Sequence, residues 1–115
     1  MITWKIFCSY LLLLLLLLIC KTSSGQITVT HYNAGWNKKH DVEWIKDLKD
    51  CDIAKIDIAK HPKFQKKHKI VVVPTIVIFK DGEEMKRFQA DISFSIKATR
   101  KELQDYINEL LMSDF

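Results

Sequence analysis

The sequence predicts an α/β fold with the element order β-α-β-α-β-β-α, in which a mixed sheet of about four strands carries helices on both faces. Two short segments rich in apolar residues are separated by a stretch of helix length, which favours a parallel βαβ unit with a right-handed crossover. Two further segments flank Asp81-Gly82, a dipeptide typical of tight hairpin turns. An amphipathic helix closes the chain. The predicted strands are residues 26–32, 53–58, 75–80 and 84–89.

The first 25 residues have the layout of a secretory signal peptide. Lys5 gives a positive start and residues 6–20 are apolar. Ser23 and Gly25 are the small residues expected three and one positions before a cut that precedes Gln26. We therefore predict an exported protein, periplasmic or extracellular, with no stable membrane span after signal cleavage.

Two other readings of this N-terminal segment stay open. An uncleaved membrane anchor needs about 20 apolar residues, whereas residues 6–20 supply 15. A lipid-modified Cys20 would follow Ile19, which is larger than the residue usual before such a cysteine. Cleavage ranks first, the anchor second and the lipoprotein third.

The predicted mature chain, residues 26–115, is long enough for one small domain with one core. Removal of the signal takes away two lysines and no acid, so 18 basic residues become 16 against 14 acidic ones, a net charge of +2. That small excess predicts no nucleic-acid partner. Cys8 and Cys20 leave with the signal, and Cys51 alone cannot form an internal disulfide.

The first strand and the helix after it are predicted from residues 26–50. Asn33-Ala34-Gly35 interrupts the first strand. The side chain of Asn37 can accept hydrogen bonds from the free amides of a first helical turn, so we predict it as an N-cap. The helix should end near Lys49-Asp50. Its apolar stripe has a three-residue spacing, with Trp44 beside it, and consists of Val42, Ile45 and Leu48.

The next elements are shorter. Pro62 suits the first turn of a helix, because its missing N–H group has no partner there in any case. It opens a basic helix that extends over residues 64–68, and the run Lys66-Lys67-His68-Lys69 predicts a solvated face. Residues 70–73 then lead into Pro74 and the third strand.

The last helix is the best defined. Thr99 and Glu102 form a capping box, in which each side chain bonds the backbone of the other residue. Residues at i, i+3, i+4, i+7 and i+8 form its apolar face: Leu103, Tyr106, Ile107, Leu110 and Leu111. The preceding segment 92–96 alternates apolar and polar residues, which predicts an extended arm at the sheet edge or a small surface for a partner.

Three features together resemble the thioredoxin family over residues 27–112. Pro62 opens the second helix, Pro74 follows it within Val73-Pro74-Thr75, and Phe79-Lys80-Asp81-Gly82-Glu83 matches the hairpin of the family. The resemblance implies a thioredoxin-like fold. It also implies a cis peptide bond before Pro74 and a position for that proline facing the active site.

The chain departs from the family at the active-site motif. Where a thioredoxin carries Trp-Cys-x-x-Cys, this sequence reads Trp36-Asn37-Lys38-Lys39-His40. The family needs a thiolate at a helix start and a second thiol within reach, and neither Asn37 nor His40 supplies one. The buried acid of the family is replaced by Thr30 or His31. We therefore predict no catalytic residues and no thioredoxin-type oxidoreductase activity.

Other chemistry has few candidate groups. Two histidines, His31 and His40, make too small a ligand set for a metal, so we predict no metal and no cofactor. We interpret His40 as a solvent-facing residue of a first turn. Cys51 precedes the second strand, where a lone cysteine is more often a small buried apolar residue than a reactive thiol.

The function predicted first is that of a peptide-binding or protein-binding module. In the family, backbone groups beside the cis-proline pair with an extended peptide, and this needs no sulfur. Trp36, Val73, Pro74 and Thr75 would form the groove, and the partner would be an exported peptide, a protein segment or a sister subunit. The alternative is a redox protein acting through Cys51. A third reading assigns assembly to the segment around Phe94; the oligomeric state is not predicted.

Overall fold

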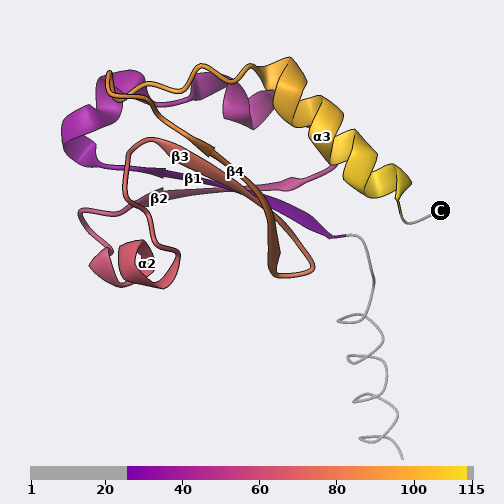
Figure 1. The fold of residues 1–115 in the computed structure, drawn as a ribbon, viewed down its shortest axis with the longest axis horizontal. Coiled ribbons are helices and arrows are strands. Elements are labelled where there is room, and N and C mark those ends of the chain that lie inside the picture. Colours follow the sequence, from indigo (N-terminus) through magenta and orange to yellow (C-terminus); the bar gives the residue numbers. More distant parts are fainter. Residues whose placement is uncertain (1–25, 114–115) are drawn as a thin grey trace, which may run out of the picture.

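The computed structural model describes residues 26–113 and contains a four-stranded mixed sheet in the order β2-β1-β3-β4 (Figure 1). β1 pairs with β2 in parallel and with β3 in antiparallel, and β3 pairs with β4 in antiparallel. The strands are β1 (Ile27–Asn33), β2 (Asp52–Asp57), β3 (Thr75–Lys80) and β4 (Glu83–Gln89). The helical elements are η1 (Gly35–His40), η2 (Glu43–Asp47), α2 (Pro62–Lys67) and α3 (Arg100–Met112). The predicted signal segment lies outside the described residues.

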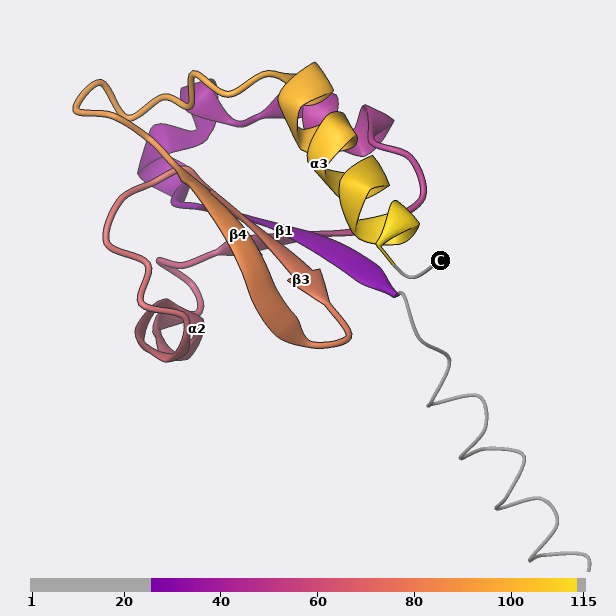
Figure 2. The ribbon, with the colours of Figure 1, turned by 45° about the vertical axis from the view of Figure 1, so that its right-hand side comes forward.

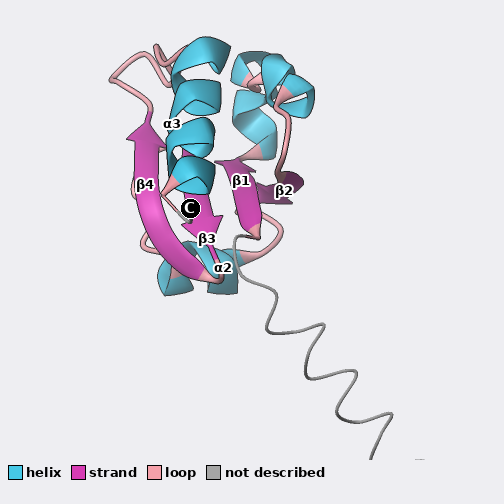
Figure 3. Ribbon diagram, turned by 90° about the vertical axis from the view of Figure 1, so that its right-hand side faces the viewer, coloured by secondary structure: helices cyan, strands magenta, loops and turns pink. Residues whose placement is uncertain are grey.

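The sheet separates two apolar clusters. Alternate residues of a strand point to opposite faces, so β1 gives Val29 to the cluster under α3 and η2, and Tyr32 to the cluster on the other face. Figure 3 shows α3 and the 3-10 helices on one side of the sheet and α2 on the other. All buried residues of both clusters lie between Ile27 and Leu110, so residues 26–115 contain the whole hydrophobic core of the described fold.

Helix α3 begins with one of the two bonds of the predicted capping box. The Thr99 hydroxyl accepts a hydrogen bond from the Glu102 N–H group at 3.2 Å. Leu103, Ile107 and Leu110 are buried against the sheet, with Tyr106 and Leu111 partly buried beside them. The hairpin is also confirmed, since Asp81 and Gly82 have positive φ angles of 53° and 84°, as a tight turn of this type requires.

The helix predicted from Asn37 to Asp50 is wrong. The structure has two short 3-10 helices, η1 and η2, with extended backbone at Asp41 and Val42 between them. The Val42 N–H group donates to Nε2 of His31 at 3.1 Å, and so is not available for helical pairing. The spacing of Val42, Ile45 and Leu48, all buried, fits the three residues per turn of a 3-10 helix.

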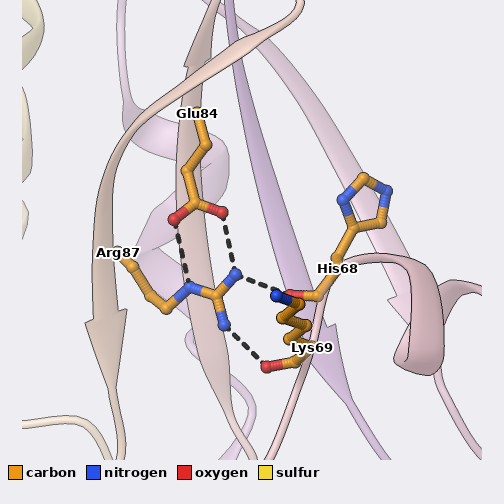
Figure 4. A network of polar contacts seen from close by, with 4 residues as sticks. All are labelled: His68, Lys69, Glu84 and Arg87. Atoms are coloured by element: carbon orange, nitrogen blue, oxygen red, sulfur yellow. Dashed lines mark hydrogen bonds and ion pairs between the residues drawn. The ribbon is translucent and has the colours of Figure 1, made fainter.

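Helix α2 is fastened to the sheet by Arg87 of β4 (Figure 4). The Arg87 guanidinium donates to the carbonyl groups of His68 at 2.6 Å and Lys69 at 2.8 Å. It also pairs with the Glu84 carboxylate at 2.8 Å. The His68 ring packs against Tyr32 and Phe79, at centroid distances of 5.7 and 5.6 Å. None of the residues of α2 itself is buried, so these flanking contacts hold the helix in place.

Residues 92–96 form no strand, and the segment between β4 and α3 instead passes beside η1 (Figure 2). Within residues 26–113, no helix has the length and apolar character needed to cross a membrane.

Candidate functional site

Three segments that are distant in the sequence meet at Asn37, within η1. Nδ2 of Asn37 donates to the Phe94 carbonyl at 3.1 Å, the Asn33 side chain at 3.1 Å and the Val73 carbonyl at 3.4 Å. The Asn33 amide in turn donates to the Asn37 carbonyl at 3.1 Å and to the Asp41 carboxylate. Asn37 is 2% exposed, and it lies where the resemblance places the first cysteine.

Asn37 is therefore not the N-cap that the sequence suggests. Ala34 occupies the cap position of η1, and no side chain caps it. An amide can donate and accept at once, and the buried carbonyl groups around Asn37 need a donor. The same need explains why its side chain turns inward rather than toward the free amides of the first turn.

The predicted groove residues lie around this junction. Val73, Pro74 and Thr75 are buried, and the peptide bond between Val73 and Pro74 is cis. The Pro74 carbonyl accepts from the Ala90 N–H group at 3.1 Å, which brings the end of β4 to the proline. Only Trp36 of the four predicted residues is open to solvent, with 66% of its surface exposed.

Phe94, which the sequence does not assign to the groove, completes the surface. Its ring meets that of Trp36 edge to face, with centroids 5.5 Å apart, a favoured aromatic geometry. Its backbone has a positive φ of 59°, and its carbonyl bonds Asn37. Val71 and Ile92, from the two segments joined at the junction, are also exposed. The only signal in the sequence was the apolar alternation of residues 92–96.

The two histidines near the site differ in their surroundings. His31 is 2% exposed, and burial, opposed by Asp41 and aided by Lys55, lowers its pKa. Because its Nε2 accepts from Val42, the ring is neutral with the proton on Nδ1. His40 is half-buried at the last residue of η1, which corrects its interpretation as a solvent-facing first-turn residue. Residues 26–113 contain no group of three His, Cys, Asp or Glu side chains that could hold a metal.

Cys51 lies away from this junction. β1 and β2 are parallel, and Asp52, which follows Cys51, pairs with Thr28 near the start of β1, whereas η1 follows the end of that strand. The thiol is half-buried against the apolar cluster under α3. Burial, and then the charges of Asp52 and Asp50, raise its pKa. A raised pKa leaves less thiolate, the reactive form, at neutral pH.

Comparisons with known proteins agree on the family. The model of the family described as Thioredoxin matches residues 34–109. Over 47 residues the chain is 43% identical to thioredoxin Y1 of Arabidopsis thaliana, covering 40% of this chain and 27% of that protein. Over 75 residues it is 32% identical to glutaredoxin 3 of Danio rerio, covering 60% and 23%. The matched segments thus span about a quarter of these two relatives.

Solved structures show the same fold. Thioredoxin 1 of Thermosipho africanus has a TM-score of 0.62 at 21% identity, covering 76% of this chain and 97% of that one. Thioredoxin of Fasciola hepatica has a TM-score of 0.56 at 26% identity, covering 82% and 89%. The sheet order, the match over residues 34–109 and these neighbours lead to one conclusion. The chain belongs to the thioredoxin family.

Proposed function

We propose that this protein is an exported thioredoxin-family binding module that captures an extended peptide or protein segment without dithiol exchange. The observation that carries the proposal is the exposed Trp36–Phe94 pair, mounted on the buried Asn37 junction. Asn37 has no sulfur, and the remaining cysteine of the described chain lies at the opposite end of β1. This site therefore offers a surface for binding rather than a thiol for redox chemistry.

The exposed side chains define the chemistry of the partner. Trp36 and Phe94 present apolar faces, and Val71 is 77% and Ile92 100% exposed. Trp36 and Phe94 are in contact, and contiguous exposed apolar surface is typical of interaction sites. Aromatic residues dominate the energy of such contacts. An extended segment with apolar side chains suits this surface.

Strand addition is the contact that the resemblance implies beside Pro74. In this structure Val73, Pro74 and Thr75 are buried, and the Val73 carbonyl already accepts from Asn37 at 3.4 Å. The proposal therefore places the peptide on the exposed side chains of Trp36 and Phe94.

The test is selection of random peptides displayed on phage against residues 26–115. We expect selected peptides to be rich in apolar residues and to lose affinity by about tenfold or more for Trp36→Ala, as for a hot-spot residue. Met112→Ala is the control, because Met112 is exposed on α3, outside the proposed surface. Peptides that bind Trp36→Ala and the native chain equally would refute this site.

Family membership favours a second candidate, redox chemistry through Cys51. Its half-buried thiol and raised pKa weigh against it. A thiol-dependent activity that disappears in Cys51→Ser would support this candidate over the binding module.

A further inference from the structure

A surface pocket of about 370 Å³ lies at the carboxyl ends of the parallel strands β1 and β2. His31 and Asn33 of β1 and Lys55 and Asp57 of β2 line it, with η1 at one side. In open α/β sheets, ligands bind in the crevice outside the carboxyl ends of the strands. The volume falls within the range of small-molecule sites. Trp36 does not line this pocket, so it is distinct from the peptide surface.

Three lysines from three segments converge on the pocket: Lys38 of η1, Lys55 of β2, and Lys60 from the turn that follows β2. Among residues 26–113 none of the three forms an ion pair. Lys55 lies directly opposite His31 in the β1–β2 register. These ammonium groups are therefore available to a ligand.

The two acids of the pocket are already engaged by the protein. Asp41 accepts a hydrogen bond from the amide of Asn33. Oδ1 of Asp57 accepts from the Ala59 N–H group at 2.9 Å. His31 is neutral and adds no charge of its own. Three cations face two anions that have donors, so the positive charge exceeds the negative charge at this crevice.

We propose that this pocket binds a small organic anion bearing a carboxylate or a phosphate group. The lysines contact its oxygens through charge-assisted hydrogen bonds, and Ala34 and Ile56 line the wall for its apolar part. Gly35 lies close to one of the two acids of the pocket, since a Cβ atom there would lie 3.3 Å from Oδ2 of Asp57. Anion binding at this pocket does not depend on peptide binding at Trp36.

The experiment is a titration of ¹⁵N-labelled residues 26–115 with inorganic phosphate and, separately, with succinate, followed by amide chemical shifts at constant ionic strength. Saturable shifts at Gly35, Lys38 and Asp57 are expected with at least one anion. Saturation by phosphate alone, or by succinate alone, supports the proposal and tells the two sources apart. Shifts that stay linear with both anions overturn it.

Two double variants separate the pocket from general surface charge. Lys55→Gln/Lys60→Gln should weaken binding by about tenfold or more, since it removes two of three cationic contacts. Lys66→Gln/Lys67→Gln lowers the net charge equally, but these exposed lysines of α2 do not line the pocket. This control should bind as the native chain does. Equal loss in both variants would overturn the proposal, because binding would then follow net charge alone.

Discussion

Asn37→Ala removes the amide that holds three segments together, and its cost can be worked out from the structure. The variant leaves the Val73 carbonyl and the Asn33 side chain buried without their donor, while the half-exposed Phe94 can turn its carbonyl toward water. Each buried polar group left without a partner costs about 1–3 kcal/mol. Two such groups predict a loss of about 2–6 kcal/mol in the free energy of unfolding.

This loss is large for a domain of this size, whose total stability is roughly 5–15 kcal/mol. Urea unfolding of residues 26–115, monitored by tryptophan fluorescence, measures it directly. Asn108→Ala is the matched control, because Asn108 is exposed on α3 and its change should stay within about 0.5 kcal/mol. A loss below about 0.5 kcal/mol for Asn37→Ala would refute the claim that the Asn37 hydrogen bonds hold the segments of Trp36 and Phe94 together.

Three further predictions concern other contacts. The fold lowers the pKa of His31. The stability that the neutral ring contributes is therefore present above the unfolded pKa of about 6.5, and it falls as the pH drops from there toward the folded pKa. His31→Gln should flatten this fall in urea unfolding measured from pH 7 to pH 5. Cys51 should react with a thiol-labelling reagent at pH 7 more slowly than a thiol in an unfolded chain, because its pKa is raised by burial. Arg87→Gln removes the charged donor to His68 and Lys69, so stability should fall by about 1–3 kcal/mol and amide exchange should rise first in residues 61–70.

Each of these predictions has a contrary outcome. An unchanged pH profile in His31→Gln would mean that the ring is not held neutral in the fold. A labelling rate for native Cys51 equal to that of the urea-unfolded chain would show an open thiol. Faster exchange in α3 than in α2 for Arg87→Gln would show that Arg87 does not anchor α2.

The sequence was sufficient where local patterns decide the structure. The strands lie within a residue or two of their predicted bounds, and Thr99 caps α3 as its spacing with Glu102 requires. The stripe Val42, Ile45 and Leu48 was also correct as a buried face, although its period belongs to a 3-10 helix.

Contacts between distant segments account for what the sequence did not reveal. Asn37 is a residue type that is common at N-caps. Its side chain points inward because it bonds the carbonyl groups of Val73 and Phe94, which are 36 and 57 residues away in the sequence. The break between η1 and η2 depends on the acceptor that His31 offers to Val42. Phe94 reaches Trp36 through a loop whose path no local propensity fixes. The pocket also depends on contacts between distant segments, because the pairing of β1 and β2 brings Lys55 beside His31.

Insulin reduction with dithiothreitol shows whether this fold carries out dithiol exchange. Residues 26–115 are compared with a dithiol thioredoxin and with Cys51→Ser. We expect the chain and Cys51→Ser both to stay at the background rate, because Asn37 and His40 supply no sulfur. A rate well above background that is lost in Cys51→Ser would contradict this expectation, since the thiol at the start of β2 would then carry redox chemistry.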